Sequence, residues 1–143
     1  MMKAPGLPLA AVALLLLTVD AVACRCPVPK DPWVETPIIF LARITTTSPA
    51  TEGFGGLPAQ SFAVANYTVV ERFRNARSLP TQLRTEIPGI GSCGIELVVG
   101  DEYLVFTTSS GLVGECTATK RFSRESDIAL YRRLEAIRRE ETP

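Results

Sequence analysis

Four cysteines constrain the fold of this 143-residue chain more than any other feature of its sequence. Cys24 and Cys26 are separated by one residue, and the other two, Cys93 and Cys116, lie far along the chain. An even number of cysteines in a small exported domain is typical of a disulfide framework, here of two bridges. A Cys24–Cys26 bridge would be strained and would close almost no loop, so two connectivities remain. Each of them ties the segment 24–26 to two distant points. In the loop-entropy model, each bridge that closes such a long loop adds about 4 kcal/mol to the free energy of unfolding.

The residues before Cys24 have the pattern of a cleaved secretory signal. A weakly basic start that ends at Lys3 precedes an apolar run over residues 7–19 and a small-x-small sequence at residues 21–23. The apolar run is shorter than the about 20 residues that a membrane span needs, which favours cleavage over a retained anchor helix. The sequence therefore predicts a signal peptide over residues 1–23 and a secreted, extracellular domain over residues 24–143. This domain would begin with a cysteine that carries a free α-amine.

A bacterial lipoprotein signal is a second interpretation, because it also places a cysteine directly after the cleavage site. Ala23 and Val22 fit that pattern, whereas Ala21 stands where leucine is usual. Acylation of Cys24 would consume the α-amine, and the product would then be periplasmic or lipid-anchored.

Composition argues against several classes of function. Fifteen basic and fifteen acidic side chains give a formal net charge of zero, which disfavours nucleic acid and a polybasic membrane patch. The chain has no histidine, which is the commonest general base and the commonest metal ligand. A Cys-x-Cys metal site is therefore a weaker interpretation than disulfides, and no serine or carboxylate has an evident activating partner. We expect a protein that is not an enzyme, has no cofactor and has no membrane span.

The body of the chain is predicted to be mainly β. Proline keeps the first segment extended, and a compact turn over residues 30–35 can hold a short helix with Trp33 as a core anchor. The glycine- and proline-containing residues 48–61, with Phe54 near their tip, predict a loop or a long hairpin connection. Strands are expected where β-branched and alternating residues gather, over residues 38–47, 62–74, 81–87, 102–108 and 112–119.

The C-terminal part of the chain is predicted to be helical, unlike the β-rich body. Ser123 or Ser126 can cap a helix that has Asp127 in its first turn. An apolar stripe at helical spacing follows, formed by Ile128, Leu130, Tyr131, Leu134 and Ile137. About five strands and this amphipathic C-terminal helix predict a five-stranded OB-like Greek-key barrel with the helix packed on it.

Several motifs together resemble one known family. They are Cys24-x-Cys26, Ser92-Cys93-Gly94-Ile95-Glu96-Leu97, Asp101-Glu102-Tyr103-Leu104-Val105-Phe106 and Cys116. The combination is similar to the N-terminal inhibitory domain of the tissue inhibitors of metalloproteinases, which belongs to the netrin-like modules. The predicted strands over residues 38–47 and 62–74 are similar to the first two long strands of that family, so the resemblance covers nearly all of residues 24–143.

The resemblance implies a fold, a disulfide pairing and an activity. It implies an OB-like netrin-type barrel, with Cys24 bridged to Cys93 and Cys26 bridged to Cys116. The implied partner is a zinc metalloprotease, whose catalytic zinc would be chelated by the α-amine and carbonyl of Cys24 in place of the attacking water. We expect such an inhibitor to act as a monomer.

The resemblance also assigns roles to the neighbours of Cys24. Arg25 would enter the specificity pocket of the protease. Along the substrate cleft would lie Cys26, Pro27 and Val28, flanked by Gly91 and Ser92. Arg25 departs from the family, which usually has a small hydroxyl residue there, and the third disulfide and separate C-terminal domain of vertebrate members have no counterpart here. A non-inhibitory netrin-like binding module, with purely structural cysteines, is therefore the alternative.

Overall fold

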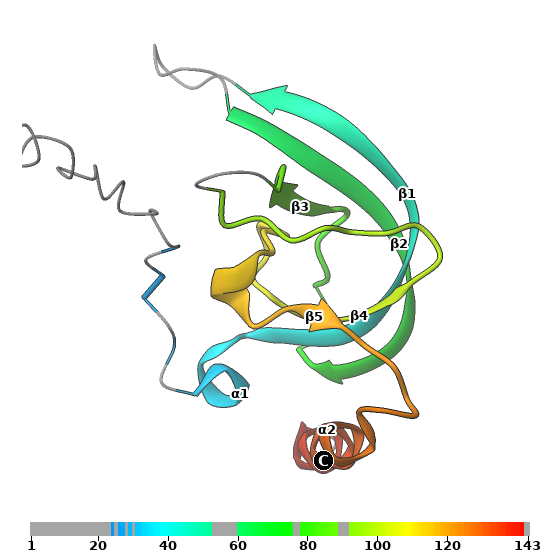
Figure 1. Cartoon of the computed structure of the whole chain (residues 1–143). Helices are drawn as coiled ribbons and strands as arrows, with labels where there is room; N and C mark the ends of the chain where they lie inside the picture. The colour runs from blue at the N-terminus through cyan, green and yellow to red at the C-terminus, as the bar shows by residue number, and fades with distance from the viewer. Residues whose placement is uncertain are drawn as a thin grey trace, which may run out of the picture.

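The computed structural model describes residues 24, 26, 27, 29, 31–52, 60–75, 78–88 and 92–141. This part of the chain is mainly β, with five strands in one antiparallel sheet and a C-terminal helix, as predicted (Figure 1). The elements in chain order are α1 (Pro32–Glu35), β1 (Ile38–Glu52), β2 (Gln60–Arg74), β3 (Leu83–Glu86), β4 (Glu102–Thr107), the 3-10 helix η1 (Glu115–Thr117), β5 (Lys120–Arg121) and α2 (Ile128–Glu141).

The strands have the order of a Greek key. The sheet runs β3-β2-β1-β4-β5, so three consecutive strands lie side by side and the fourth returns beside the first. Every strand pair in it is antiparallel. The Greek-key order predicted from the sequence is thus found in the structure.

The chain after β4 closes this sheet on itself. The Arg84 N–H of β3 donates to the carbonyl of Gly111 at 2.9 Å, and the Val113 N–H donates to the carbonyl of Arg84 at 2.8 Å. These bonds form a parallel bridge between Arg84 and Leu112. Gly111 has a φ of +71°, and a Cβ there would overlap the main-chain oxygen of Gln82. The contact joins the far edge of the sheet to the chain beyond β4, which gives a barrel-like body.

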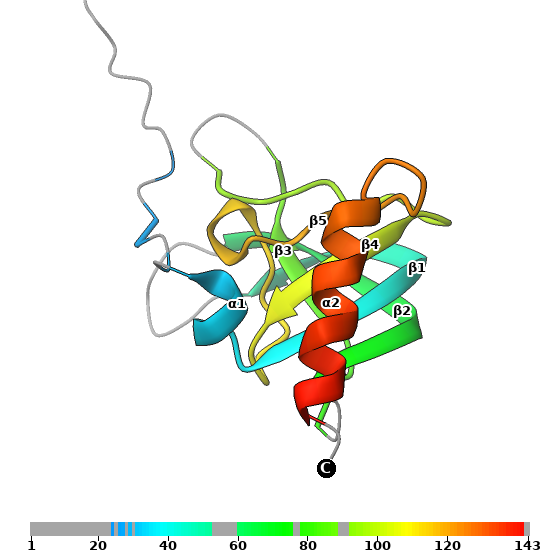
Figure 2. The same cartoon turned by 90° about the horizontal axis from the view of Figure 1, so that it is seen from below.

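Strand β1 is buried on both of its faces over residues 38–42. Phe40 and its even-numbered neighbours face the interior cluster, which also contains Leu83 and Val105. Ile39 and Leu41 face the opposite side and belong to a second cluster with Leu134 of α2. Figure 2 shows α2 lying across this outer side of the sheet. The first half of β1 therefore separates two apolar cores.

Helix α2 is also fixed to β2 by a group of polar contacts around one carboxylate. The Tyr131 hydroxyl donates to the Glu71 carboxylate at 3.0 Å, and the Arg138 guanidinium donates to it at 2.5 Å. The Arg124 guanidinium lies 3.7 Å from the same carboxylate.

None of the helices in the described part of the chain has both the length and the apolar character that crossing a membrane requires.

The predicted strand over residues 112–119 is wrong. Leu112 forms only the single bridge to β3, and residues 115–117 form η1, which carries Cys116. The reason is local, because the Thr117 hydroxyl donates to the carbonyl of Gly114 at 3.0 Å and accepts from its N–H at 3.1 Å. These bonds close a tight turn, and the fifth strand of the sheet forms after it.

The hairpin arms are longer than the sequence predicted. The β1–β2 ladder continues to the pair of residues 52 and 60, so much of the predicted connection 48–61 is strand. Pro49 lies where β1 is an edge strand, because its pairing with β4 ends at Arg43, and edge strands are where proline is tolerated. Phe54 lies outside the described residues.

Two predictions on helices have different outcomes. The short helix near Trp33 forms, and the Trp33 ring meets Phe106 edge-on at 4.9 Å between centroids, so its role as a packing residue is confirmed. At the start of α2 the prediction of an apolar stripe is wrong for Ile128, which is 58% exposed. Asp127 directly precedes the helix instead of lying in its first turn, and its carbonyl accepts from the Tyr131 N–H.

Candidate functional site

Two disulfides attach the amino-terminal segment to the body. Cys24 is joined to Cys93 with 5.5 Å between their Cα atoms, and Cys26 is joined to Cys116 with 5.2 Å. These are the two pairs that the family resemblance implies. No cysteine is free. Two neighbouring points of an extended segment are thus held on the barrel through loops that span most of the domain.

Cys93 is positioned by the end of strand β3. Its N–H donates to the Glu86 carboxylate at 3.0 Å, and the Ile95 N–H donates to the Thr85 hydroxyl at 2.9 Å. Between them, Gly94 lies so close to β3 that a Cβ on it would overlap the main-chain oxygen of Glu86. The bonds and the close approach fix the chain on both sides of the cysteine.

Cys116 is positioned by η1, which lies directly beside Cys93. The Glu115 N–H donates to the Cys93 carbonyl at 2.9 Å. A Cβ on Gly114 would lie 2.6 Å from the same carbonyl oxygen, so these two segments approach closely. The body therefore presents both anchoring cysteines at one place.

The sulfur atoms gather as a result. The Sγ atoms of Cys26, Cys93 and Cys116 lie within 4.8 Å of one another. All three belong to disulfides and carry no thiolate, which is the form of cysteine that binds metals. The arrangement is thus a pair of adjacent disulfides, and it supplies no ligand set for the Cys-x-Cys metal site that the sequence left open.

The remaining predicted site residues are placed as follows. Ser92 is half-buried, its carbonyl oxygen lies 3.3 Å from the Cys24 Sγ atom, and its hydroxyl accepts from the Gly94 N–H at 3.1 Å. Ser92 therefore lies beside Cys24, and its role next to a protease cleft stays a prediction. Pro27 is exposed. The other three predicted residues, Arg25, Val28 and Gly91, lie outside the described residues.

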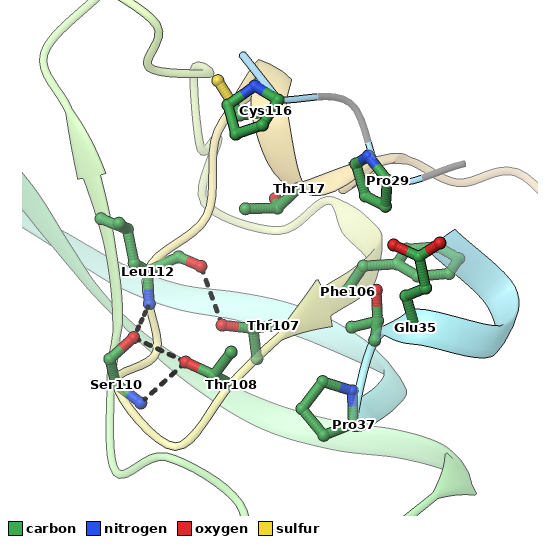
Figure 3. Close-up of a pocket in the computed structure, with 12 residues that line it drawn as sticks. Pro29, Glu35, Pro37, Phe106, Thr107, Thr108, Ser110, Leu112, Cys116 and Thr117 are labelled. Carbon is green, nitrogen blue, oxygen red and sulfur yellow. Dashed lines mark hydrogen bonds between the residues drawn. The ribbon is translucent and has the colours of Figure 1, made fainter. Parts of the chain in front are cut away.

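A groove of about 450 Å³ runs beside this segment, and it was not predicted from the sequence. Figure 3 shows it between Pro29, the short helix that carries Glu35, and the turn that follows β4. In that turn the Thr108 and Ser110 hydroxyl oxygens lie 2.9 Å apart and share a hydrogen bond. The groove could not be found in the sequence because its walls come from three separate parts of the chain: the amino-terminal segment, the residues around α1, and the residues that end and follow β4. The fold brings these parts together, in part through the pairing of β1 with β4. Its lining is mostly apolar and hydroxyl-bearing and includes Pro27, Pro29, Glu35, Phe106, Ser110 and Leu112.

Comparison with known proteins gives no match, either to a protein-family model or to a curated protein. The functional proposal therefore depends on the geometry of the amino-terminal segment and on the motifs in the sequence.

Proposed function

We propose that this protein is a secreted inhibitor of zinc metalloproteases, and that Cys24 is its first residue after signal cleavage. One observation carries the proposal: the cysteine that follows the predicted cleavage site is bridged to a body that is itself rigid at that point. The second bridge, two residues later, holds the same segment again. Two bridges on three residues fix the position of that segment more closely than one bridge would.

The chemistry follows from what a first residue offers. The nitrogen of a free α-amine and the oxygen of the same residue's carbonyl can bind one metal ion together. The catalytic zinc of a protease has three protein ligands and an open position that normally holds the attacking water. An amine and carbonyl placed on that zinc displace the water, and the protease is inhibited without any bond being cut.

Rigidity is what makes such a short contact strong. A flexible segment loses conformational freedom when it enters a cleft, whereas a segment already held at Cys24 and Cys26 has lost that freedom on folding. In this proposal Arg25 enters the specificity pocket and Val28 lies farther along the cleft. Gly91 and Ser92 flank Cys26, Pro27 and Val28, and the inhibitor acts as a monomer on an extracellular or periplasmic protease.

A first experiment determines where the secreted protein begins. The intact mass of the secreted product should correspond to residues 24–143 with two disulfides and no lipid. A mass that corresponds to a chain starting at another residue contradicts zinc chelation by the α-amine of Cys24. A mass that corresponds to an acyl chain on Cys24 contradicts it as well and indicates a lipoprotein on the same barrel.

A second experiment blocks the amine alone. The predicted mature chain contains only two lysines, Lys30 and Lys120, so a Lys30→Arg/Lys120→Arg variant has the α-amine as its only reactive amine. Acetylation of this variant should abolish inhibition of zinc metalloproteases, while the untreated variant inhibits like the wild type. Equal inhibition before and after acetylation would exclude the mechanism.

A non-inhibitory binding module on the same barrel is the second candidate. The open groove beside Pro27 and Pro29 favours it, because the groove could hold a partner without any use of the amine. If the untreated variant inhibits no zinc metalloprotease, and the untreated and acetylated forms bind the same partner protein equally well, the module function is the correct one.

A further inference from the structure

The two disulfides lie close enough to react with each other. The Cys93 Sγ atom belongs to one bridge, yet it lies within 4.8 Å of both Sγ atoms of the other bridge, those of Cys26 and Cys116. All four cysteines are partly exposed, so a small thiol can reach them. A thiolate formed in one bridge is thus already beside the sulfur atoms that it would attack.

The four cysteines fall into two groups by how they are held. Cys93 and Cys116 belong to the body, since the Cys93 main chain bonds to Glu86 and Glu115. The described residues of the segment 24–29 make no main-chain hydrogen bond with the rest of the described chain. The prolines among them have no N–H to donate. Apart from side-chain packing, the disulfides hold the described residues of this segment in place.

We propose that the two bridges form one thiol–disulfide exchange unit whose substrate is a dithiol reductant. In the first step the dithiol attacks the Cys24–Cys93 bond, is oxidised to its own disulfide, and leaves Cys24 and Cys93 reduced. In the second step the Cys93 thiolate attacks the Sγ atom of Cys116. A Cys93–Cys116 bond forms, the bond to Cys26 breaks, and Cys26 leaves as a thiolate that takes up a proton.

Attack at the other bridge gives the same product. If the dithiol first reduces Cys26–Cys116, the Cys116 thiolate attacks Cys93 and expels Cys24. Either route consumes two electrons in all, retains one disulfide in the body and releases both amino-terminal cysteines. A single reduction therefore detaches the whole segment, which two independent bridges would not allow.

Two physical terms favour this product. The Cys93–Cys116 bond closes a much shorter loop than either original bond, and shorter loops lose less entropy on closure. The detached segment regains the backbone freedom that it lost on folding. The exchange needs a thiolate, so its rate should rise with pH toward the ordinary cysteine pKa of about 8.5.

The test is partial reduction of the oxidised full-length secreted protein with dithiothreitol, which is itself a dithiol. Samples are quenched in acid, alkylated with N-ethylmaleimide and mapped without further reduction by peptide mass spectrometry. The species that has lost one disulfide should contain the Cys93–Cys116 cross-link, with maleimide on Cys24 and Cys26. A one-disulfide species that keeps Cys24–Cys93 or Cys26–Cys116, or that contains Cys26–Cys93, would overturn the proposal.

Two matched variants provide a second readout. Cys24→Ser and Cys93→Ser each remove one partner of the same bridge and leave three cysteines. In Cys24→Ser, the free Cys93 should form a disulfide with Cys116, so that Cys26 becomes a free thiol that maleimide alkylates. In Cys93→Ser, the Cys26–Cys116 disulfide should remain. If both variants keep Cys26–Cys116, the exchange does not occur. These mapping results do not depend on protease inhibition, so they stand or fall separately from the proposed function.

Discussion

The main-chain carbonyl of Cys93 accepts a hydrogen bond of 2.9 Å from the main-chain N–H of Glu115. This bond joins the chain after β3 to η1, and Cys116 is the next residue of η1. The two anchoring cysteines are therefore held side by side by the body itself. The amino-terminal segment attaches to a pair of points whose spacing is already determined.

Gly94→Ala should disturb this arrangement. A Cβ at position 94 would overlap the Glu86 main-chain oxygen, so the chain that carries Cys93 has to shift. We expect a loss of about 1–3 kcal/mol in the free energy of unfolding, as for overpacking elsewhere, together with weaker inhibition. Urea unfolding and inhibition assays measure the two effects. Gly100→Ala is the control, because a Cβ there meets nothing within 4 Å and the only strain comes from its φ of +94°.

Glu71→Gln should loosen α2. The carboxylate accepts bonds from Tyr131 and Arg138 and is only 13% exposed, and hydrogen bonds to charged groups contribute about 1.5–3 kcal/mol. We expect a loss in that range on urea unfolding. The matched control is Glu135→Gln, whose carboxylate is 33% exposed and lies 3.6 Å from the same arginine. The control should lose less than about 0.5 kcal/mol, and equal losses in the two variants would contradict the account of how α2 is attached.

Asp127 should make the stability depend on pH in acid. The hydrogen bond from Lys120 and then the main-chain N–H of Ser123 lower the pKa of Asp127 below its usual 3.8. The folded-state pKa is thus below the unfolded-state pKa, so this stabilisation is fully present well above pH 3.8 and is lost as the pH falls through the folded-state value. Urea midpoints of the wild type and Asp127→Asn should differ at pH ~6 and converge toward pH ~2. A difference that does not change with pH would contradict this role.

The sequence predicts most of the fold because its apolar pattern is regular where the core lies. Strands β1, β2 and β4 carry continuous or alternating apolar residues. The predicted bounds of β2 and β4 agree with the structure to within two residues, whereas β1 begins where predicted but ends five residues later. The predicted strand over residues 112–119 failed because the Thr117 side chain closes a turn on Gly114, a local bond that competes with strand pairing. The loop over residues 48–61 was overestimated because glycine and proline signal a turn but do not say where the strands stop.

The candidate site was predictable only in part. The cysteines could be found by counting, and their pairing came from the family resemblance. The contact between Cys93 and Glu115 and the closeness of the two disulfides depend on how the chain after β3 meets η1. The groove depends on how the amino-terminal segment lies against α1 and the turn after β4. The periodicity of apolar residues in the sequence does not predict these contacts between distant segments.

Inhibition by the Cys24 amine should increase with pH. An α-amine binds metal only when it is neutral, and an ordinary α-amine has a pKa of about 8. The sign follows directly: below that pKa the affinity should rise about tenfold per pH unit, and above it the affinity should level off. Inhibition constants between pH ~6 and ~9 measure this, and a value that is flat across the range would argue against the amine as a ligand.

The most direct test converts the amine to an amide without changing the rest of the molecule. Protein produced to begin at Cys24 is compared with protein that keeps Ala23 in front of it, with both disulfides verified in each and the same zinc metalloprotease as target. We expect the protein that starts at Cys24 to inhibit, and the one-residue extension to raise the inhibition constant by at least about a hundredfold, or about 2.7 kcal/mol. Equal inhibition by the two proteins, or no inhibition by the protein that starts at Cys24, would contradict the claim that its amino end binds the zinc.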